Sequence, residues 1–195
     1  MSPADPSAGV EPAIRCLLGR AWTALRPPPP PDCYAPAQPD ERELRWRRLD
    51  RVRDLLEQAA AVIARDGFTS GAWFSVGQPS GAVRLVTGAA ALPYRDSTAP
   101  VHSSCLVGTL VRLADDPDTA ATPADAWACV DELYEAMHEQ LGHASLPPGR
   151  CYSPAERRSR LRGLTAWNDA PGRTAEQVLD LLERAVSRTI LAAVR

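Results

Sequence analysis

The stretch from Asp40 to Gly67, DERELRWRRLDRVRDLLEQAAAVIARDG, decides the fold class of this chain. Its apolar residues recur three and four positions apart and would line one face of a helix: Leu49, Val52, Leu55, Leu56, Ala59, Ala60 and Ile63. The glycine at position 67 stands just after this pattern, where the C-terminal cap of a helix favours glycine. The stretch therefore predicts a long amphipathic helix that packs one face against a core.

The first turns of this helix are rich in charge, with six arginines in Arg42–Arg53 and five acids in Asp40–Asp54. Acid and base often follow each other in the favourable i, i+4 order, as in Glu41 and Arg45. This balance favours a solvated face over nucleic-acid binding by the arginines beside Trp46: Arg45, Arg47, Arg48 and Arg51. The formal net charge of the chain is −2, so we expect no nucleic-acid partner.

Downstream, the sequence predicts one β-hairpin followed by further helices. Residues 72–76 and 82–86 are short β-rich runs that flank the turn-forming residues 77–81, and residues 88–101 are expected to be irregular. Helix starts are indicated at Ser103 or Ser104, Thr122-Pro123-Ala124-Asp125, Ser153-Pro154-Ala155-Glu156 and Thr174-Ala175-Glu176-Gln177. The fold class is therefore mostly α (α+β), a single compact helical domain over residues 41–195 with one small β-hairpin.

The last helices have apolar faces that can be assigned to a core. The helix from Thr122 is expected to bury Ala126, Val130, Leu133, Tyr134, Met137 and Leu141 before Gly142 stops it. The helix after Thr174 continues with Val178, Leu181, Leu182, Ala185, Val186 and Thr189. These stripes require the helices to pack against one another.

Residues 1–40 have a different composition and contain ten of the 19 prolines. The run Pro27–Pro31 predicts a stiff polyproline II spacer. Before it, apolar residues at helical spacing predict a short amphipathic helix: Ile14, Leu17, Leu18, Ala21, Trp22 and Leu25. Three interpretations stay open: the helix packs back onto its own domain, the segment is disordered, or Ile14, Leu17, Leu18 and Trp22 dock into a protein partner.

Several classes of protein are excluded by composition. The chain lacks an apolar run long enough to span a membrane, and its first residues lack the basic and apolar regions of a secretory signal. Its five cysteines are widely spaced without a Cys-x-x-Cys pair, so reduced thiols in a cytoplasmic protein are expected. All 22 basic residues are arginine, which excludes lysine chemistry and, with abundant alanine and proline, indicates a GC-rich bacterial genome.

One cysteine is a candidate nucleophile. Cys105 follows a plausible helix N-cap, where backbone N–H groups and the helix dipole stabilise a thiolate. His102 is close enough in sequence to act as its base, and Asn168 or Asp169 would orient that base. The alternative is a small buried thiol that packs the helix. Because no set of four ligands at compact spacing is visible, we predict neither a metal ion nor a cofactor.

A second candidate site lies in the segment Trp167-Asn168-Asp169-Ala170-Pro171-Gly172-Arg173-Thr174. As structure, it predicts a packed tryptophan, a turn from Asn168 to Gly172, and a cap on the last helix. As function, it would place Asp169 and Arg173 at a helix N-terminus that faces a cleft and accepts an anion. The candidate ligand-binding residues, with one added from the first predicted strand, are Trp73, Trp167, Asn168, Asp169 and Arg173.

These motifs resemble those of an uncharacterised family of small actinobacterial and phage proteins, over roughly residues 49–190. The family shows a helix ending in glycine, then a Trp-x-x-Gly-like segment, a Cys-x-x-Gly-Ala helix start and a closing Trp-Asn-Asp-x-x-Gly-Arg-Thr-x-x-x-Val helix. The corresponding segments here are Asp66–Ala72, with Phe68 where tryptophan is usual, Cys105–Thr109, with Thr109 in place of alanine, and Trp167–Val178. The resemblance implies a fold but no activity.

Two classes of function therefore stay open. The first is a small cytoplasmic accessory protein that binds a partner or a ligand, which the separate N-terminal helix and the incomplete catalytic set favour. The second is a thiol-dependent enzyme that uses Cys105 in a cleft with His102 and Asp169. The two differ in the reactivity of Cys105, because a buried structural thiol is alkylated slowly.

Overall fold

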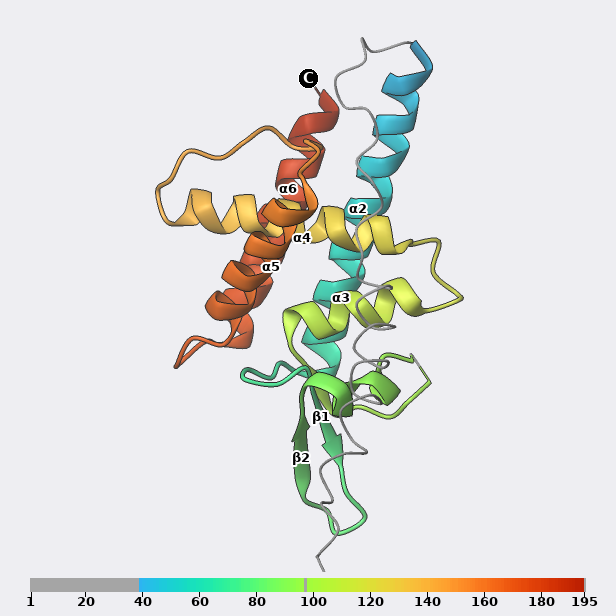
Figure 1. The fold of residues 1–195 in the computed structure, drawn as a ribbon, viewed down its shortest axis with the longest axis vertical. Helices are drawn as coiled ribbons and strands as arrows, with labels where there is room; N and C mark the ends of the chain where they lie inside the picture. Colours follow the sequence, from blue (N-terminus) through green and yellow to red (C-terminus); the bar gives the residue numbers. More distant parts are fainter. Residues whose placement is uncertain (1–38, 97, 195) are drawn as a thin grey trace, which may run out of the picture.

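The computed structural model describes residues 39–96 and 98–194 of the chain (Figure 1). Along the chain it contains helix α2 (Pro39–Asp66), strands β1 (Phe74–Gly77) and β2 (Val83–Val86), the 3-10 helix η1 (Gly88–Tyr94), strand β3 (Ser103–Ser104), and helices α3 (Leu106–Asp115), α4 (Pro123–Gln140), α5 (Pro154–Asn168) and α6 (Ala175–Val194). This confirms the mostly α fold with a small sheet. The predicted N-terminal helix with Ile14, Leu17, Leu18 and Trp22, and its proline spacer, lie outside the described residues.

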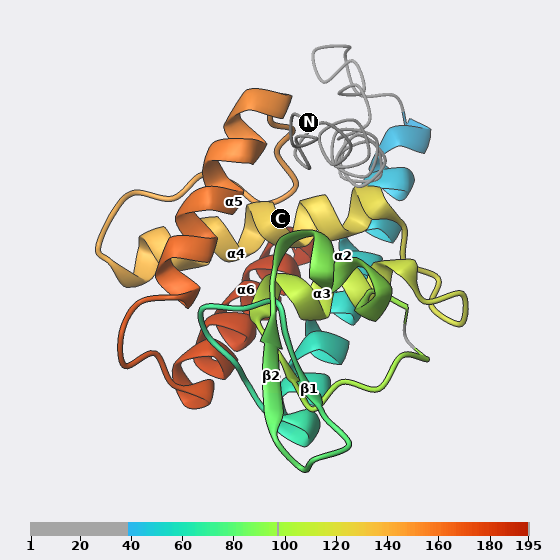
Figure 2. The ribbon, with the colours of Figure 1, turned by 60° about the horizontal axis from the view of Figure 1, so that its bottom comes forward.

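The main core is built between helices. The two longest, α2 and α6, run antiparallel, and α4 packs across both (Figures 1 and 2). The apolar stripe predicted for α2 is confirmed: all of its members are buried except Ala60, which is half-buried. The helix ends as expected, because Gly67 has a φ of +89° and its N–H donates to the carbonyl of Ile63 over 3.0 Å.

No helix in the described part of the chain is long and apolar enough to cross a membrane.

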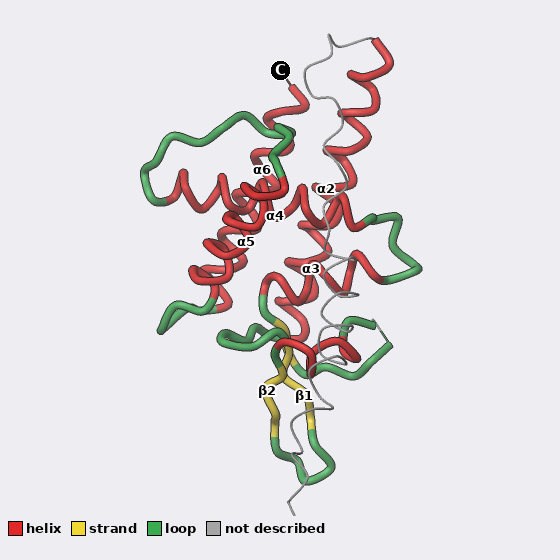
Figure 3. Tube along the Cα trace, in the orientation of Figure 1, coloured by secondary structure: helices red, strands yellow, loops and turns green. Residues whose placement is uncertain are grey.

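The predicted hairpin is present as β1 and β2, which project beyond one end of the helices (Figure 3). A third strand adds to it, giving an antiparallel sheet in the order β2-β1-β3. In this sheet Phe74 lies opposite Val86 on one side and Ser104 on the other. A second small core covers the sheet: Phe74, Val76, Val86 and Ala91. The sequence did not predict β3, because a strand of two residues carries no periodicity.

Three of the four predicted helix caps are confirmed. Thr122 and Ser153 each form a capping box with the acid three residues later, and a proline follows each at the first helical position. Thr174 accepts the N–H of Gln177 over 3.3 Å, and the Gln177 side chain accepts the N–H of Thr174 over 3.2 Å. The apolar stripe of α6 is buried as predicted, with Val186 half-buried.

The fourth predicted cap is wrong. Neither Ser103 nor Ser104 caps α3; both belong to β3, and the N-cap is Cys105. The serine hydroxyls are used inside the sheet and the core instead, because Ser103 pairs with Ser75 over 2.6 Å and Ser104 pairs with Thr109 over 2.6 Å. These long-range partners outweigh the local capping preference.

Three further expectations are corrected. Residues 88–101 are not wholly irregular, because Gly88–Tyr94 form η1. Leu141 is 59% exposed rather than buried, since it lies at the C-cap of α4, beyond the helical face that reaches the core. The turn predicted from Asn168 begins only at Asp169, because α5 continues through Asn168. A buried amide at position 168 therefore belongs to a helix and not to a loop.

Arginines in the charge-rich first turns of α2 form intramolecular hydrogen bonds and ion pairs. Arg45 donates to the carbonyl of Pro148 over 3.1 Å. Arg51 pairs with Asp125 at 3.2 Å, and Arg47 forms an ion pair one turn from Glu43. The contacts of Arg51 and Arg45 connect the start of α2 to the beginning of α4 and to the loop after α4, whereas the pair of Arg47 with Glu43 stays within α2.

Candidate functional site

Cys105 caps α3 through its side chain. Its Sγ accepts a hydrogen bond of 3.2 Å from the N–H of Gly108, and its own N–H donates to the carbonyl of Trp73 over 2.9 Å. The residue is only 5% exposed. Burial, together with the nearby charge of Asp169, raises the pKa of the Cys105 thiol to about 11. At neutral pH it is therefore a thiol, and not the thiolate that acts as a nucleophile.

The two residues predicted to assist this thiol are placed differently. Asp169, at the C-cap of α5, lies near enough for its charge to act on Cys105. His102 is exposed just before β3, where its backbone N–H donates to the carbonyl of Ser75 over 2.7 Å. Across the described residues, no hydrogen bond or ion pair joins the side chain of His102 to Cys105 or Asp169. The structure thus brings the thiol and the carboxylate together without linking the histidine to them.

Asn168 and Asp169 connect three segments that are far apart in sequence. The Oδ1 of Asn168 accepts the N–H of Leu106 over 3.1 Å, and its Nδ2 donates to Oδ1 of Asp169 over 2.7 Å. The same Asp169 oxygen accepts the N–H of Gly71 over 2.9 Å. Asn168 is 1% exposed, so its amide is a buried connector between α5, the start of α3 and the loop after α2.

The start of α3 approaches β1 so closely that only glycine fits at one position. A Cβ on Gly108 would lie 2.6 Å from the carbonyl oxygen of Trp73, which is backbone and has no side-chain rotamer to change. One residue later, the Thr109 hydroxyl donates to the carbonyl of Cys105 over 3.0 Å and pairs with Ser104. The Cys-x-x-Gly-Thr segment is therefore a tight structural joint.

Trp167 and Arg173 close the loop between α5 and α6. The Arg173 guanidinium lies 3.8 Å above the Trp167 ring, and its Nε donates to the carbonyl of Trp167 over 3.0 Å. Its Nη1 donates to the side chain of Gln177 over 3.1 Å. These contacts engage the Arg173 guanidinium within its own loop; the binding of an anion by Arg173 stays a prediction.

A pocket of about 110 Å³ opens beside this joint, between α3 and α4. Of the sequence-predicted ligand residues, Trp73 lines it, whereas the lining described here includes none of Trp167, Asn168, Asp169 and Arg173. Its wall is almost entirely apolar and comes from several elements: Trp73, Val107, Leu110, Val111, Ala114, Pro123, Ala126, Trp127, Val130 and Leu161. Arg95 and Asp115 complete the lining. A concave apolar site with few polar groups is the usual form of a small-molecule site.

Sequence reasoning missed this pocket apart from Trp73. The apolar positions of α3 and α4 are typical of core, and nothing in their spacing indicates a space between the two helices. A weak signal is the pair Ala114 and Ala126, whose small side chains leave room between helices that otherwise present larger residues.

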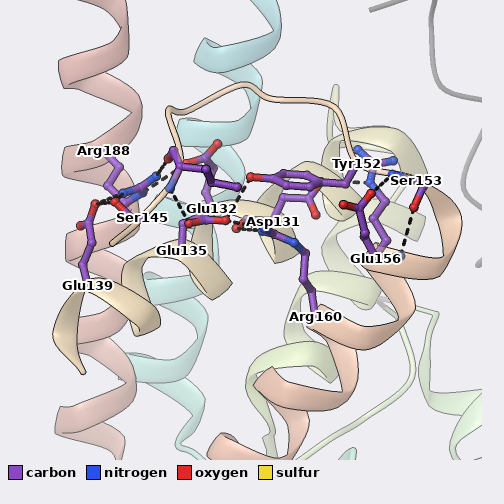
Figure 4. Close-up of polar contacts among 12 residues, drawn as sticks. Asp131, Glu132, Glu135, Glu139, Ser145, Tyr152, Ser153, Glu156, Arg160 and Arg188 are labelled. Atoms are coloured by element: carbon purple, nitrogen blue, oxygen red, sulfur yellow. Dashed lines mark hydrogen bonds and ion pairs between the residues drawn. The ribbon is translucent and has the colours of Figure 1, made fainter. Parts of the chain in front are cut away.

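A second feature that the sequence did not predict is the acidic face of α4, formed by Asp131, Glu132, Glu135 and Glu139 (Figure 4). Nε of Arg157, on α5, lies 2.9 Å from Oδ2 of Asp131, and Arg160 pairs with Glu135. Arg188, on α6, pairs with Glu132 and Glu139. Because a buried charge is costly without its partner, these pairs fix α5 and α6 against α4.

The acidic face also binds the loop between α4 and α5. Glu135 accepts the N–H of Leu146 over 2.7 Å and the hydroxyl of Tyr152 over 3.0 Å. Glu132 accepts the N–H of Gly149 over 2.9 Å. Backbone groups of a loop that crosses the protein are thus satisfied by side chains of one helix, as buried polar groups require.

One atom of the acidic face is left without a partner. Oδ1 of Asp131 is buried and accepts no hydrogen bond from the described residues. Burial raises the pKa of Asp131 to about 6, although Arg157 and Arg160 act in the opposite direction. Within residues 39–96 and 98–194, no three His, Cys, Asp or Glu side chains are grouped so that they could hold a metal ion.

Comparison with known proteins places the chain in a family but gives no activity. A family described as a family of unknown function (DUF6197) matches residues 47–188. No curated protein and no solved structure matches the chain. The family match spans nearly the same residues as the resemblance found in the sequence; the actinobacterial or phage origin and the individual motifs stay predictions.

Proposed function

Since the chain belongs to this family of unknown function, we propose its activity from the site alone: a small cytoplasmic accessory protein that binds a ligand in the apolar pocket between α3 and α4. The observation that carries the proposal is the pocket itself, about 110 Å³ beside a core of closely packed helices. The apolar wall of this partly open pocket faces water and lacks the dispersion contacts that a closely packed interior makes. An apolar ligand would restore those contacts.

The alternative, a thiol-dependent enzyme that uses Cys105 with His102 and Asp169, has less support. Burial raises the pKa of this thiol to about 11, although the N–H of Gly108, which donates to Sγ, acts in the opposite direction. A reactive cysteine needs a lowered pKa and access to solvent. A protein partner bound through the N-terminal residues Ile14, Leu17, Leu18 and Trp22 is a separate proposal that rests on their sequence pattern.

The ligand-binding proposal is tested with two single-ring probes, toluene and phenol, added to the ¹⁵N-labelled full-length chain. We expect saturable NMR shifts of pocket residues, the indole N–H of Trp127 among them. Filling the pocket with Ala126→Leu should abolish these shifts. The matched control Ala124→Leu, on the same helix but outside the pocket lining, should preserve them.

Two results would count against the proposal. If neither probe shifts the pocket residues, the pocket does not bind ligands of this size. If native Cys105 is alkylated by iodoacetamide at pH 7 as fast as a free thiol, then Cys105 is accessible and reactive, and the enzyme alternative is favoured over ligand binding.

A further inference from the structure

The edge of the pocket carries an ion pair that uses only part of its hydrogen-bonding capacity. Arg95 follows η1, and Asp115 is the last residue of α3. Nε and Nη2 of Arg95 both donate to the same oxygen, Oδ2 of Asp115, over 2.8 and 2.5 Å. This geometry differs from the two-oxygen fork that arginine and a carboxylate commonly form.

The shared oxygen leaves one donor and one acceptor unused. In the described part of the chain, neither Nη1 of Arg95 nor Oδ1 of Asp115 has a hydrogen-bond partner. Both residues line the pocket, with side chains 15% and 31% exposed. They are the only charged side chains among its described lining residues, and their charges cancel. The pocket thus combines an apolar wall with a neutral edge that offers one donor and one acceptor.

The wall and the volume limit the size and shape of a ligand. Apolar cavities of about 150 Å³ enclose a benzene molecule. This pocket of about 110 Å³ is smaller but partly open, so a single ring would fill it and extend in part beyond it. Trp73 and Trp127 supply aromatic surfaces, against which a planar ring packs favourably.

We propose that the pocket binds a neutral single-ring aromatic molecule with one group that both donates and accepts a hydrogen bond, as a phenol does. The ring lies against the apolar wall, and the hydroxyl accepts from Nη1 of Arg95 and donates to Oδ1 of Asp115. Because the charges of Arg95 and Asp115 cancel, the edge offers neither a carboxylate nor an ammonium group a net attraction that would offset the loss of its hydration. A plain hydrocarbon would displace water from the edge and leave both groups without partners. This inference rests on the ligand-binding function proposed above.

The test compares four probes of similar size on the full-length chain at pH 7: phenol, toluene, benzoate and benzylammonium. Dissociation constants are measured by NMR titration of the pocket residues. We expect phenol to bind about tenfold more tightly than toluene, because phenol makes hydrogen bonds to the charged groups of Arg95 and Asp115 and toluene makes none. Both charged probes should bind more weakly than phenol.

Two substitutions at the edge should reverse the charge preference. Asp115→Asn leaves the Arg95 cation without its counter-charge, so benzoate affinity should rise at least about tenfold. Arg95→Gln leaves the Asp115 carboxylate, so the affinity for benzylammonium should rise instead. Asp118→Asn removes the same charge from the exposed loop after α3 and should leave the order of the four probes unchanged.

The outcomes separate this inference from the proposed function. Equal affinities for phenol and toluene at the pocket would overturn the inference and leave the ligand-binding function standing. Tighter binding of benzoate than of phenol to the unsubstituted chain would also overturn it. If none of the four probes binds, the proposed function fails and the inference fails with it.

Discussion

Oδ1 of Asn168, in the last turn of α5, accepts a hydrogen bond of 3.1 Å from the N–H of Leu106, the first residue of α3. The first N–H groups of a helix have no partner within the helix. Here one of them is satisfied by an amide 62 residues away in sequence, and Cys105 satisfies another. The start of α3 therefore depends on a contact between distant elements as well as on its own cap.

Substituting this amide should destabilise the fold. Asn168→Ala leaves the N–H of Leu106 buried and unpaired, so we expect the free energy of unfolding to fall by about 2 to 3 kcal/mol. Urea denaturation measures the free energy of unfolding of each variant. The control Asp169→Asn keeps an oxygen for the N–H of Gly71 and should cost much less. A loss for Asn168→Ala no larger than that of the control would mean that water replaces the amide.

A methyl group at position 108 should be poorly tolerated. In Gly108→Ala the new Cβ would lie 2.6 Å from the carbonyl oxygen of Trp73, so α3 or β1 must move. We expect a loss of about 2 to 3 kcal/mol, typical of overpacking, measured as a lower melting temperature. Gly77→Ala is the matched control, because a Cβ there meets nothing within 4 Å. Equal melting temperatures would show that the joint is less tight than its geometry implies.

The cap of α6 can be tested by one substitution. Thr174→Ala removes the hydroxyl that accepts the N–H of Gln177, and the free energy of unfolding should fall by about 1 kcal/mol. Thr174→Ser keeps the acceptor and should remain close to the original stability. An unchanged melting temperature for the alanine variant would argue that Thr174 serves a ligand instead.

Asp131 should make stability depend on pH in an unusual direction. Its pKa is raised by burial to about 6 from an ordinary value of 3.8. Between these values the folded chain holds this proton while the unfolded chain releases it, so the contribution of Asp131 to stability is complete below about pH 4 and is lost as the pH rises through 6. Glu135 acts in the opposite direction: backbone and Arg160 hydrogen bonds outweigh burial and lower its pKa.

The comparison with Asp131→Asn isolates this contribution, because all other titrating groups are shared. The free energy of unfolding of the original chain, relative to the variant, should fall by about 2 to 3 kcal/mol between pH 4 and pH 7. Urea denaturation at each pH measures the difference. A difference that does not vary with pH would mean that Asp131 titrates at the same pH folded and unfolded.

Removal of residues 1–39 should leave a folded domain. The main core is formed by described residues of α2, α3, α4, α5 and α6, and Pro39 is only the first residue of α2. We expect one cooperative thermal transition. If the shortened chain aggregates or unfolds gradually, Leu17, Leu18 and Trp22 belong to the core.

The sequence by itself determined those elements whose signals are local. The stripes of α2 and α6 follow from helical periodicity, and the starts at Thr122, Ser153 and Thr174 follow from side chains that bond to the backbone three residues on. The hairpin follows from two β-rich runs joined by turn residues. Each of these features depends on atoms within one or two turns of chain, so a single sequence contains the information.

The tertiary structure alone decided what happens between elements. Cys105, rather than Ser103 or Ser104, caps α3 because both serines lie in β3. Asn168 is a buried connector because α5 ends beside the start of α3. The pocket is space left between α3 and α4, and the buried carboxylates of the acidic face, Asp131, Glu132 and Glu135, are paired with arginines of α5 and α6. Such features depend on distances between residues far apart in sequence. Those distances are set by the packing of all the helices together, which no local pattern encodes.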